Sequence, residues 1–355
     1  MPLIIDKREV AVDNSRLKSA YTVPMRTASL NIALVNNMPD SALEDTERQF
    51  ADLLGAAAGN IPVRMRLYSL PGIARSDRVQ EHLSDAYFGI EDLISSRFDG
   101  VILTGTEPRR PDLREEPYWS ALVKVFDWAE SNTASAVLSC LAAHASVLYS
   151  DGISRQALGD KRFGVFEERK VSDHALLGSG GGTMRFPHSR WNEVQEDALT
   201  SAGYVVLTKS LEAGVNLFVK KKKESLFVYF QGHPEYSPQT LLKEYRRDVG
   251  RFLRLERATY PSMPREYFDR ASTKLLTEFQ ENALARPRKE LMAEFPEDVV
   301  ARSLQNPWHS PAVRIYRNWL EYVASKRDDV STFGSMARVD RPKSSSPWRA
   351  PTDRF

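Results

Sequence analysis

The sequence has little cysteine: Cys140 is the only one in 355 residues. One cysteine excludes an intrachain disulfide framework, which fits a reducing cytoplasm. The six histidines are scattered and have no second cysteine beside them, a pattern unlike that of a zinc site. We therefore expect no bound metal.

The sequence also lacks an excess of either charge and any long apolar run. Its 49 Lys and Arg residues nearly balance 47 Asp and Glu residues, which favours neither nucleic acid nor a membrane surface as a partner. No stretch reaches the roughly 18 apolar residues of a membrane span. Met1–Arg26 has only Leu3-Ile4-Ile5 before charges resume, unlike a signal peptide. The run Lys220–Lys223 predicts a solvated hairpin tip, because no aromatic residue interleaves with it. We expect a cytoplasmic protein with small-molecule substrates.

What is present is an alternation of apolar strand-like and amphipathic helical segments. The residues are 42% hydrophobic and 27% charged, as in ordinary globular proteins. The stretch 73–96 is loose apart from a helix at 89–95. The alternation predicts an α/β fold with a doubly wound, mostly parallel sheet flanked by helices. Strands are expected at 30–37, 63–68, 99–106 and 134–139, and helices at 42–58, 118–131 and after residue 140.

The second half of the chain differs from the first in its pattern of predicted elements. Short strands are expected at 204–207, 215–219 and 226–230, followed by a helix at 238–255. Arginine-rich helical segments follow, including an amphipathic piece at 313–325. The Ser- and Pro-containing end predicts disorder. We divide the chain into an N-terminal arm (1–27), a main domain (28–256), a helical C-terminal extension packing on the core (257–330) and a disordered tail (331–355).

Cys140 stands where a buried strand meets a helix of small residues. A side chain at such a strand-to-helix turn lies at the carboxyl end of the sheet, beside the first N–H groups of the helix. Those groups and the helix dipole favour a thiolate, and hence a nucleophile. The alternative is a small buried hydrophobic residue, because free cysteine is commonly buried.

A histidine and a carboxylate follow later, in Gly232-His233-Pro234-Glu235. On an extended segment, His233 and Glu235 point to the same face, so the carboxylate can orient the imidazole. With Cys140 they form the nucleophile, base and orienting group of acyl transfer. The alternative for His233 is a surface turn. The N–H of Leu141 and one from Gly105 or Thr106 are the expected oxyanion donors, unless that turn is only a strand end.

His144 lies one helical turn beyond Cys140. It is either a second base or a packed residue of the helix that follows Cys140. The crowding of small residues around it favours the packed residue.

These residues belong to an ordered set of motifs that resembles the homoserine O-succinyltransferase family. The resemblance implies a class I glutamine amidotransferase-like (flavodoxin-like) fold and a role in methionine biosynthesis. It also implies that Cys140 is the acyl-thioester nucleophile, His233 the proton acceptor and Glu235 its partner. It covers about residues 31–324 and rests on Asn36-Asn37-Met38-Pro39, Phe98–Gly105, Tyr118-Trp119, Phe163-Gly164-Val165-Phe166, Pro187-His188-Ser189-Arg190, Gly232–Tyr236 and Glu244–Asp248.

The resemblance further assigns substrate binding to Lys161, Ser189 and Arg247. Arginine can clamp an amino-acid carboxylate in a bidentate fork, lysine adds positive charge and serine offers a hydroxyl. On chemistry alone, surface salt bridges and a loop cap explain these three residues better than substrate binding does.

The chain departs from the family near the nucleophile and in the loop after Gly105. Leu141 and His144 stand where the family usually has tryptophan and glutamine. Arg109 occupies the acyl-donor position, where glutamate goes with acetyl-CoA and glycine with succinyl-CoA. Its charge favours an anionic acyl group such as succinyl, unless it is a solvated loop residue.

The function that we predict is transfer of an acyl group from acyl-CoA to the hydroxyl of homoserine or a related amino acid, by a ping-pong mechanism. Acyl-CoA, either succinyl-CoA or acetyl-CoA, is a co-substrate and no cofactor is bound. A homodimer is left open. The alternatives are a glutamine amidotransferase or γ-glutamyl hydrolase with the same triad, and a non-catalytic binding protein.

Overall fold

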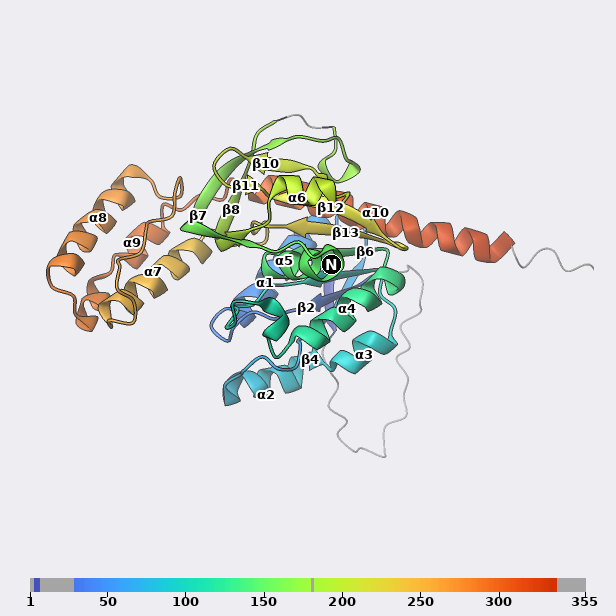
Figure 1. Cartoon of the computed structure of the whole chain (residues 1–355), viewed down its shortest axis with the longest axis horizontal. Helices are drawn as coiled ribbons and strands as arrows, with labels where there is room; N and C mark the ends of the chain where they lie inside the picture. Colours follow the sequence, from blue (N-terminus) through green and yellow to red (C-terminus); the bar gives the residue numbers. More distant parts are fainter. Residues whose placement is uncertain (1–2, 7–28, 180–181, 337–355) are drawn as a thin grey trace, which may run out of the picture.

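The computed structural model describes residues 3–6, 29–179 and 182–336, with side chains described as far as residue 327 (Figure 1). Its main sheet has the strand order β1-β3-β2-β5-β6-β13-β12-β9, with β4 paired to β3. From β1 to β13 the neighbouring strands are parallel, and β12 and β9 are antiparallel. The predicted doubly wound, mostly parallel sheet is therefore confirmed. Its strands are Leu3–Asp6 (β1), Leu30–Val35 (β2), Val63–Tyr68 (β3), Tyr87–Phe88 (β4), Gly100–Leu103 (β5), Ser135–Ser139 (β6), Val205–Val206 (β9), Leu217–Lys222 (β12) and Ser225–Phe230 (β13).

Helices cover both faces of this sheet because both faces of its central strands are apolar. Successive strand residues point to opposite faces, so Ile32 and Leu34 enter one core cluster while Ala33 and Val35 enter the other. The first cluster contains side chains of α1, α7 and α10, and the second contains those of α4 and α5. The helices are Leu43–Ala57 (α1), Asp77–Ala86 (α2), Ile90–Ser95 (α3), Trp119–Asn132 (α4), Leu141–Asp151 (α5), Glu196–Ser201 (α6), Thr240–Leu253 (α7), Arg270–Ala285 (α8), Glu297–Ala301 (α9) and His309–Met336 (α10), with 3-10 turns at Leu113–Glu115, Ala175–Leu177 and Lys289–Glu294.

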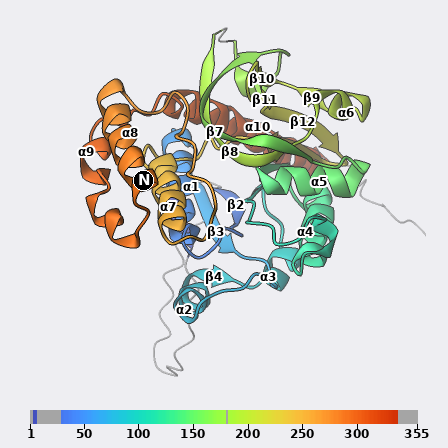
Figure 2. The same ribbon diagram turned by 60° about the vertical axis from the view of Figure 1, so that its left-hand side comes forward.

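A second, antiparallel sheet has the order β11-β10-β7-β8 and stands at one end of the main sheet (Figure 2). Its strands are Gln156–Lys170 (β7), Met184–Glu193 (β8), Thr208–Ser210 (β10) and Gly214–Val215 (β11). The His233 N–H donates to the Pro187 carbonyl of β8 over 2.8 Å. The β7–β8 hairpin is thereby joined to the carboxyl end of β13.

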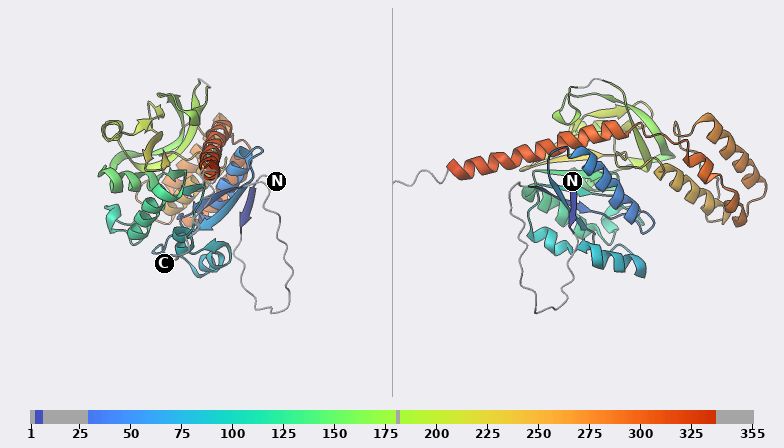
Figure 3. Two further views of the ribbon diagram at one scale, coloured as in Figure 1. Left: turned by 90° about the vertical axis from the view of Figure 1, so that its right-hand side faces the viewer. Right: turned by 180° about the vertical axis from the view of Figure 1, so that it is seen from behind.

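The helical C-terminal segment returns to the main sheet through α10, which runs across the molecule from the α7–α9 lobe (Figures 1 and 3). The indole of Trp319 donates to the Ser135 hydroxyl at the start of β6 over 2.9 Å. A Cβ at Gly100 would lie 2.9 Å from the Trp319 ring. The lack of a side chain at Gly100 therefore lets α10 lie directly against the sheet.

Three local features differ from the sequence-based expectations. Leu3–Asp6, in the expected arm, pairs with Val63–Arg66 as an edge strand, and residues 7–28 lie outside the described part. Helix α2 lies in the stretch that is expected to be loose. The pattern did not indicate a helix there, because the sequence is polar and only Val79 of α2 is buried. Helix α10 continues through Met336, beyond the expected start of the tail at 331, and residues 337–355 are not described.

The lysine run 220–223 is not a solvated tip as a whole. Only Lys223 and Glu224 form the turn between β12 and β13. The ammonium of Lys220 lies 2.7 Å from an Asp151 carboxylate oxygen, and that of Lys222 donates to the Ser150 hydroxyl. Two of the lysines therefore hold the end of α5. Within the described residues, no helix is long and apolar enough to cross a membrane.

Candidate active site

Cys140 occupies a strained turn between β6 and α5. Its backbone has φ 51° and ψ −110°, a left-handed conformation that costs a non-glycine residue roughly 1–3 kcal/mol. The Cys140 N–H donates to the Phe230 carbonyl over 2.8 Å, so β6 stays paired with β13 up to the turn. The buried strand below and the helix above hold the side chain at the carboxyl end of the sheet, as the sequence predicts.

His233 and Glu235 lie in contact beyond the end of β13. The imidazole Nδ1 and the Glu235 Oε1 are 2.8 Å apart, with both side chains 6% exposed. The Ser139 hydroxyl also donates to Oε1, over 3.4 Å. The segment forms a turn and not the expected extended strand, but the turn brings the two side chains together all the same.

The charges around His233 favour its protonated form. Burial by itself would lower the pKa of His233, but the charges of Glu235 and Cys140, and hydrogen bonds to both, raise the pKa above its ordinary value. Tyr236 stacks on the imidazole with ring centroids 4.2 Å apart. This arrangement suits a thiolate–imidazolium pair whose imidazole can later act as a base.

Gly105 and Leu141 approach closely beside the nucleophile. The Asn37 N–H donates to the Thr104 hydroxyl over 2.8 Å, which fixes the turn after β5. A Cβ at Gly105 would lie 2.8 Å from the Leu141 Cβ and 2.9 Å from its nitrogen. The expected oxyanion donors therefore lie on adjoining segments, with Thr106 next in the turn and half-buried.

Gly105→Ala is expected to lower kcat about 10²- to 10³-fold, the usual effect of losing one oxyanion donor. The new methyl group would push the turn and the Leu141 N–H apart. Steady-state kinetics would measure the loss, and thermal unfolding would show that the fold persists.

Gly89→Ala is the matched control for this substitution. Open space surrounds Gly89 and no strained backbone angle occurs there, so this variant should keep wild-type kcat. Wild-type kcat in Gly105→Ala would contradict an oxyanion role for this turn.

The three expected substrate-binding residues gather around two carboxylates of α7. Glu244 accepts hydrogen bonds from the Ser189 hydroxyl over 2.5 Å and from the Lys161 ammonium over 3.2 Å. Asp248 lies 3.6 Å from the Lys161 ammonium and accepts a hydrogen bond from Arg247 over 2.9 Å. Tyr236 donates to Glu244 over 2.8 Å, and the same tyrosine stacks on His233. The cluster therefore adjoins the triad and carries both signs of charge.

Arg109 is placed differently from the other expected residues. Its side chain is exposed, while its backbone N–H and that of Arg110 donate to the buried Glu116 carboxylate over 2.5 and 2.6 Å. The charge of Glu107, two residues earlier, reaches Arg247. The loop is thus held by its backbone N–H groups.

A buried polar network behind His233 was missed by the sequence analysis. Glu168 lies 3.0 Å from the His188 imidazole and accepts hydrogen bonds from Thr208 over 2.7 Å and Asn216 over 2.9 Å. Asn216 accepts from the Gly232 N–H over 2.7 Å. Burial raises the pKa of Glu168 to about 7. Little signal for it was available in the sequence, because Glu168 lies in the charged run Glu167–Lys170 that follows Phe166.

His144 contacts Gln231 and does not face the triad as a second base would. Its Nε2 lies 2.9 Å from the Gln231 Oε1, and burial lowers its pKa to about 3. Gln231 also donates to the Val215 carbonyl over 2.7 Å. His144 is therefore a packed residue of α5.

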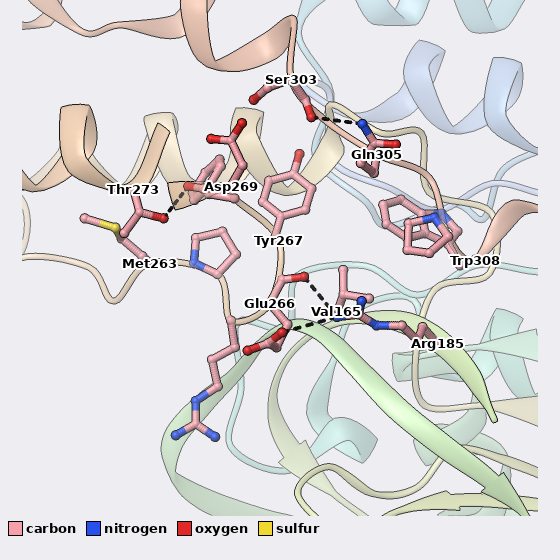
Figure 4. Close-up of a pocket in the computed structure, with 14 residues that line it drawn as sticks. Val165, Arg185, Met263, Glu266, Tyr267, Asp269, Thr273, Ser303, Gln305 and Trp308 are labelled. Atoms are coloured by element: carbon pink, nitrogen blue, oxygen red, sulfur yellow. Dashed lines mark hydrogen bonds and ion pairs between the residues drawn. The ribbon is translucent and has the colours of Figure 1, made fainter. Parts of the chain in front are cut away.

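A cavity of about 560 Å³ lies between the β7–β8 hairpin and the C-terminal helical segment (Figure 4). None of the expected site residues lines it. The indole of Trp308 in its wall donates to the Tyr236 carbonyl over 2.7 Å, so the cavity adjoins the back of the site. Among the described residues, no group of three His, Cys, Asp or Glu side chains could hold a metal ion.

Comparison with known proteins adds a family match over most of the chain. The model of the family described as homoserine O-succinyltransferase matches residues 10–330. The chain is 42% identical over 306 residues to a homoserine O-succinyltransferase of Rhodopseudomonas palustris, covering 85% of this chain and 92% of that one. It is 44% identical over 296 residues to the corresponding protein of Bradyrhizobium japonicum, covering 83% and 90%.

Similar solved structures include two glutamine amidotransferases. One is from Methylobacillus flagellatus, with 14% identity, 83% of this chain and 94% of that chain covered, and a TM-score of 0.43. The other is from Thermotoga maritima, with 12% identity, coverage of 78% and 98%, and a TM-score of 0.42. At TM-scores below 0.5 these likenesses carry no argument about activity.

Proposed function

The chain belongs to the homoserine O-succinyltransferase family and is an acyltransferase, and from this we propose that it transfers a succinyl group from succinyl-CoA to the hydroxyl of homoserine through a thioester on Cys140. The observation that carries the proposal is the meeting of three side chains at the carboxyl ends of the adjacent parallel strands β6 and β13: His233 is hydrogen-bonded to both Glu235 and Cys140. That geometry supports nucleophilic acyl transfer.

In the first half-reaction the Cys140 thiolate attacks the thioester carbonyl of succinyl-CoA. The oxyanion that forms lies beside the Leu141 N–H and the turn at Gly105. The carbon–sulfur bond to CoA then breaks, and the His233 imidazolium gives its proton to the departing sulfur. CoA leaves as a thiol, and the succinyl group remains on Cys140.

In the second half-reaction the homoserine hydroxyl attacks the acyl-enzyme. His233, now neutral, takes the hydroxyl proton as the new carbon–oxygen bond forms. The bond to Cys140 breaks, which restores the thiolate and the imidazolium. Glu235 keeps Nδ1 protonated, so that Nε2 faces the reacting atoms in both steps.

The mixed-charge cluster on α7 suits the amino-acid acceptor. An α-amino acid carries an ammonium and a carboxylate, and its site therefore needs both signs of charge. Arg247 and Lys161 supply the cations, and Glu244 and Asp248 supply the anions. We place the acceptor carboxylate on Arg247, where a bidentate fork can form.

Mass spectrometry of the intact protein tests the proposal. The protein is incubated separately with succinyl-CoA, acetyl-CoA and glutamine, and the acylated peptide is then mapped. We expect a succinyl adduct on Cys140 that disappears on addition of homoserine faster than on addition of serine. An adduct from glutamine alone would instead favour the amidotransferase alternative, and no adduct from any donor would favour a binding protein.

A further inference from the structure

Two arginines stand directly opposite each other on the β7–β8 hairpin, where Arg162 is the register partner of Arg190. Like charges directly opposite on neighbouring strands repel. Both lie on the strand face that also carries His188 and Glu168, because residues two apart in a strand share a face. Lys161 and Ser189 lie on the other face, toward Glu244.

Arg190 is buried with much of its hydrogen-bonding capacity unused. Its side chain is 2% exposed, and Nη1 lies 3.9 Å from the Glu193 carboxylate, beyond hydrogen-bond distance. One nitrogen, Nη2, donates to the Ala213 carbonyl. Nε and Nη1 of Arg190, and the buried Nε of Arg162, have no hydrogen-bond partner among the described residues. Buried donors of this kind are rarely left unpaired in proteins, so the pair lacks an acceptor.

The missing acceptor belongs close to the nucleophile. The positive charge of Arg190 acts on Cys140, as does that of the half-buried Arg155. Arg190 has two counter-charges, Glu193 at a distance of 3.9 Å and the buried Glu168, whereas Arg162 has no ion pair with any described residue. Three arginines therefore outnumber two carboxylates around Cys140 on this face, and burial favours the neutral form of one of those carboxylates, Glu168. The α7 cluster on the other face has two carboxylates for its two cations.

We propose that Arg162 and Arg190 bind the terminal carboxylate of a dicarboxylic acyl group while its carbonyl carbon is attached to Cys140. This inference rests on the proposed acyl transfer and identifies residues that select the donor. A succinyl group carries one charge, a carboxylate, which matches a site where positive charge is in excess. An acetyl group has none, and would leave both arginines unpaired.

Arg162→Met and Arg190→Met test the proposal through the first half-reaction alone. Cys140 acylation is timed by intact-protein mass spectrometry without acceptor, over a range of succinyl-CoA or acetyl-CoA concentrations. We expect wild-type enzyme to prefer succinyl-CoA. Each variant should lower the succinyl-to-acetyl ratio of specificity constants about 10- to 100-fold, the effect of losing a charge-assisted hydrogen bond. Acylation by acetyl-CoA shows in the same sample that the variant is folded.

Arg169→Met is the matched control, because Arg169 lies on the same strand β7 with its side chain 67% exposed. It should leave the ratio unchanged. Arg162 is only half-buried, so its variant remains informative if Arg190→Met does not fold. An unchanged ratio, which includes an equal loss with both donors, would overturn the inference alone. A wild-type preference for acetyl-CoA would overturn both the inference and the succinyl donor of the proposed function, while leaving the thioester on Cys140 in place. Wild-type enzyme acylated by neither donor would overturn the proposed function, and the inference with it.

Discussion

Cys140→Ala is expected to reduce turnover at least about 10⁴-fold, because both half-reactions pass through the cysteine sulfur. His144, one helical turn away, cannot replace it, because its imidazole is turned into the protein interior against Gln231. Steady-state assays with succinyl-CoA and homoserine measure the loss, and intact-protein mass spectrometry should find no acyl adduct.

A substitution at Cys140 that abolishes activity is expected to raise the stability of the protein. Because Cys140 has a φ of 51°, Cys140→Gly relieves backbone strain that alanine would retain. We expect the glycine variant to gain about 1 kcal/mol in the free energy of unfolding, after the greater freedom of glycine in the unfolded chain is offset. Chemical denaturation of the two variants measures the difference.

Together these variants separate a catalytic cysteine from a buried structural one. If the cysteine were only structural, its truncation would lower the stability of the protein and leave the activity unchanged. Near-normal turnover in Cys140→Ala, with the same donor and acceptor, would disprove the thioester mechanism. The strained backbone already favours the catalytic role, since such strain is retained where a side chain must be aimed.

The catalytic edge of the sheet could be predicted from sequence because its signals are local. Each buried strand ends in a recognisable turn, after Val35, Leu103 and Ser139, and parallel strands place such turns along one edge. The register of β2, β5 and β6 confirms that alignment. The contact between His233 and Glu235 is also local, because only one residue separates them. It was therefore predicted correctly although the segment forms a turn and not the expected extended strand.

The arginine pair and the Glu168 network could not be predicted, because they depend on long-range register. The hairpin shifts its register between Ala157 and Arg162, and a shift of one residue would have turned every side chain to the opposite face. No short-range pattern determines such a shift. Helix α2 was missed for a different reason, because it buries only Val79 and so lacks an apolar stripe.

Glu235→Gln is expected to lower kcat about 10³- to 10⁴-fold, the effect of misorienting a catalytic histidine. A glutamine amide can place its NH₂ against the His233 Nδ1, which favours the wrong tautomer. In the opposite orientation of the amide, the NH₂ occupies the position of Oε2. That atom is buried without a hydrogen-bond partner among the described residues, so the NH₂ donors would be left unpaired there. Pre-steady-state acylation and deacylation rates measure the effect, and Glu167→Gln, whose side chain is 59% exposed, is the matched control.

The stability of Glu235→Gln should depend on pH in a defined direction. A histidine whose pKa is raised by folding contributes stability that is full below its unfolded pKa of about 6.5 and is lost as pH rises through the folded pKa. Since Glu235 is one of the charges that raise the pKa of His233, the variant should lose about 1–3 kcal/mol at pH ~6 and less at pH ~9. Urea unfolding at the two pH values measures this. An equal loss at both would mean that Glu235 acts on His233 through packing alone, whereas a larger loss at low pH ties the catalytic carboxylate to the imidazolium that the acyl-transfer mechanism requires.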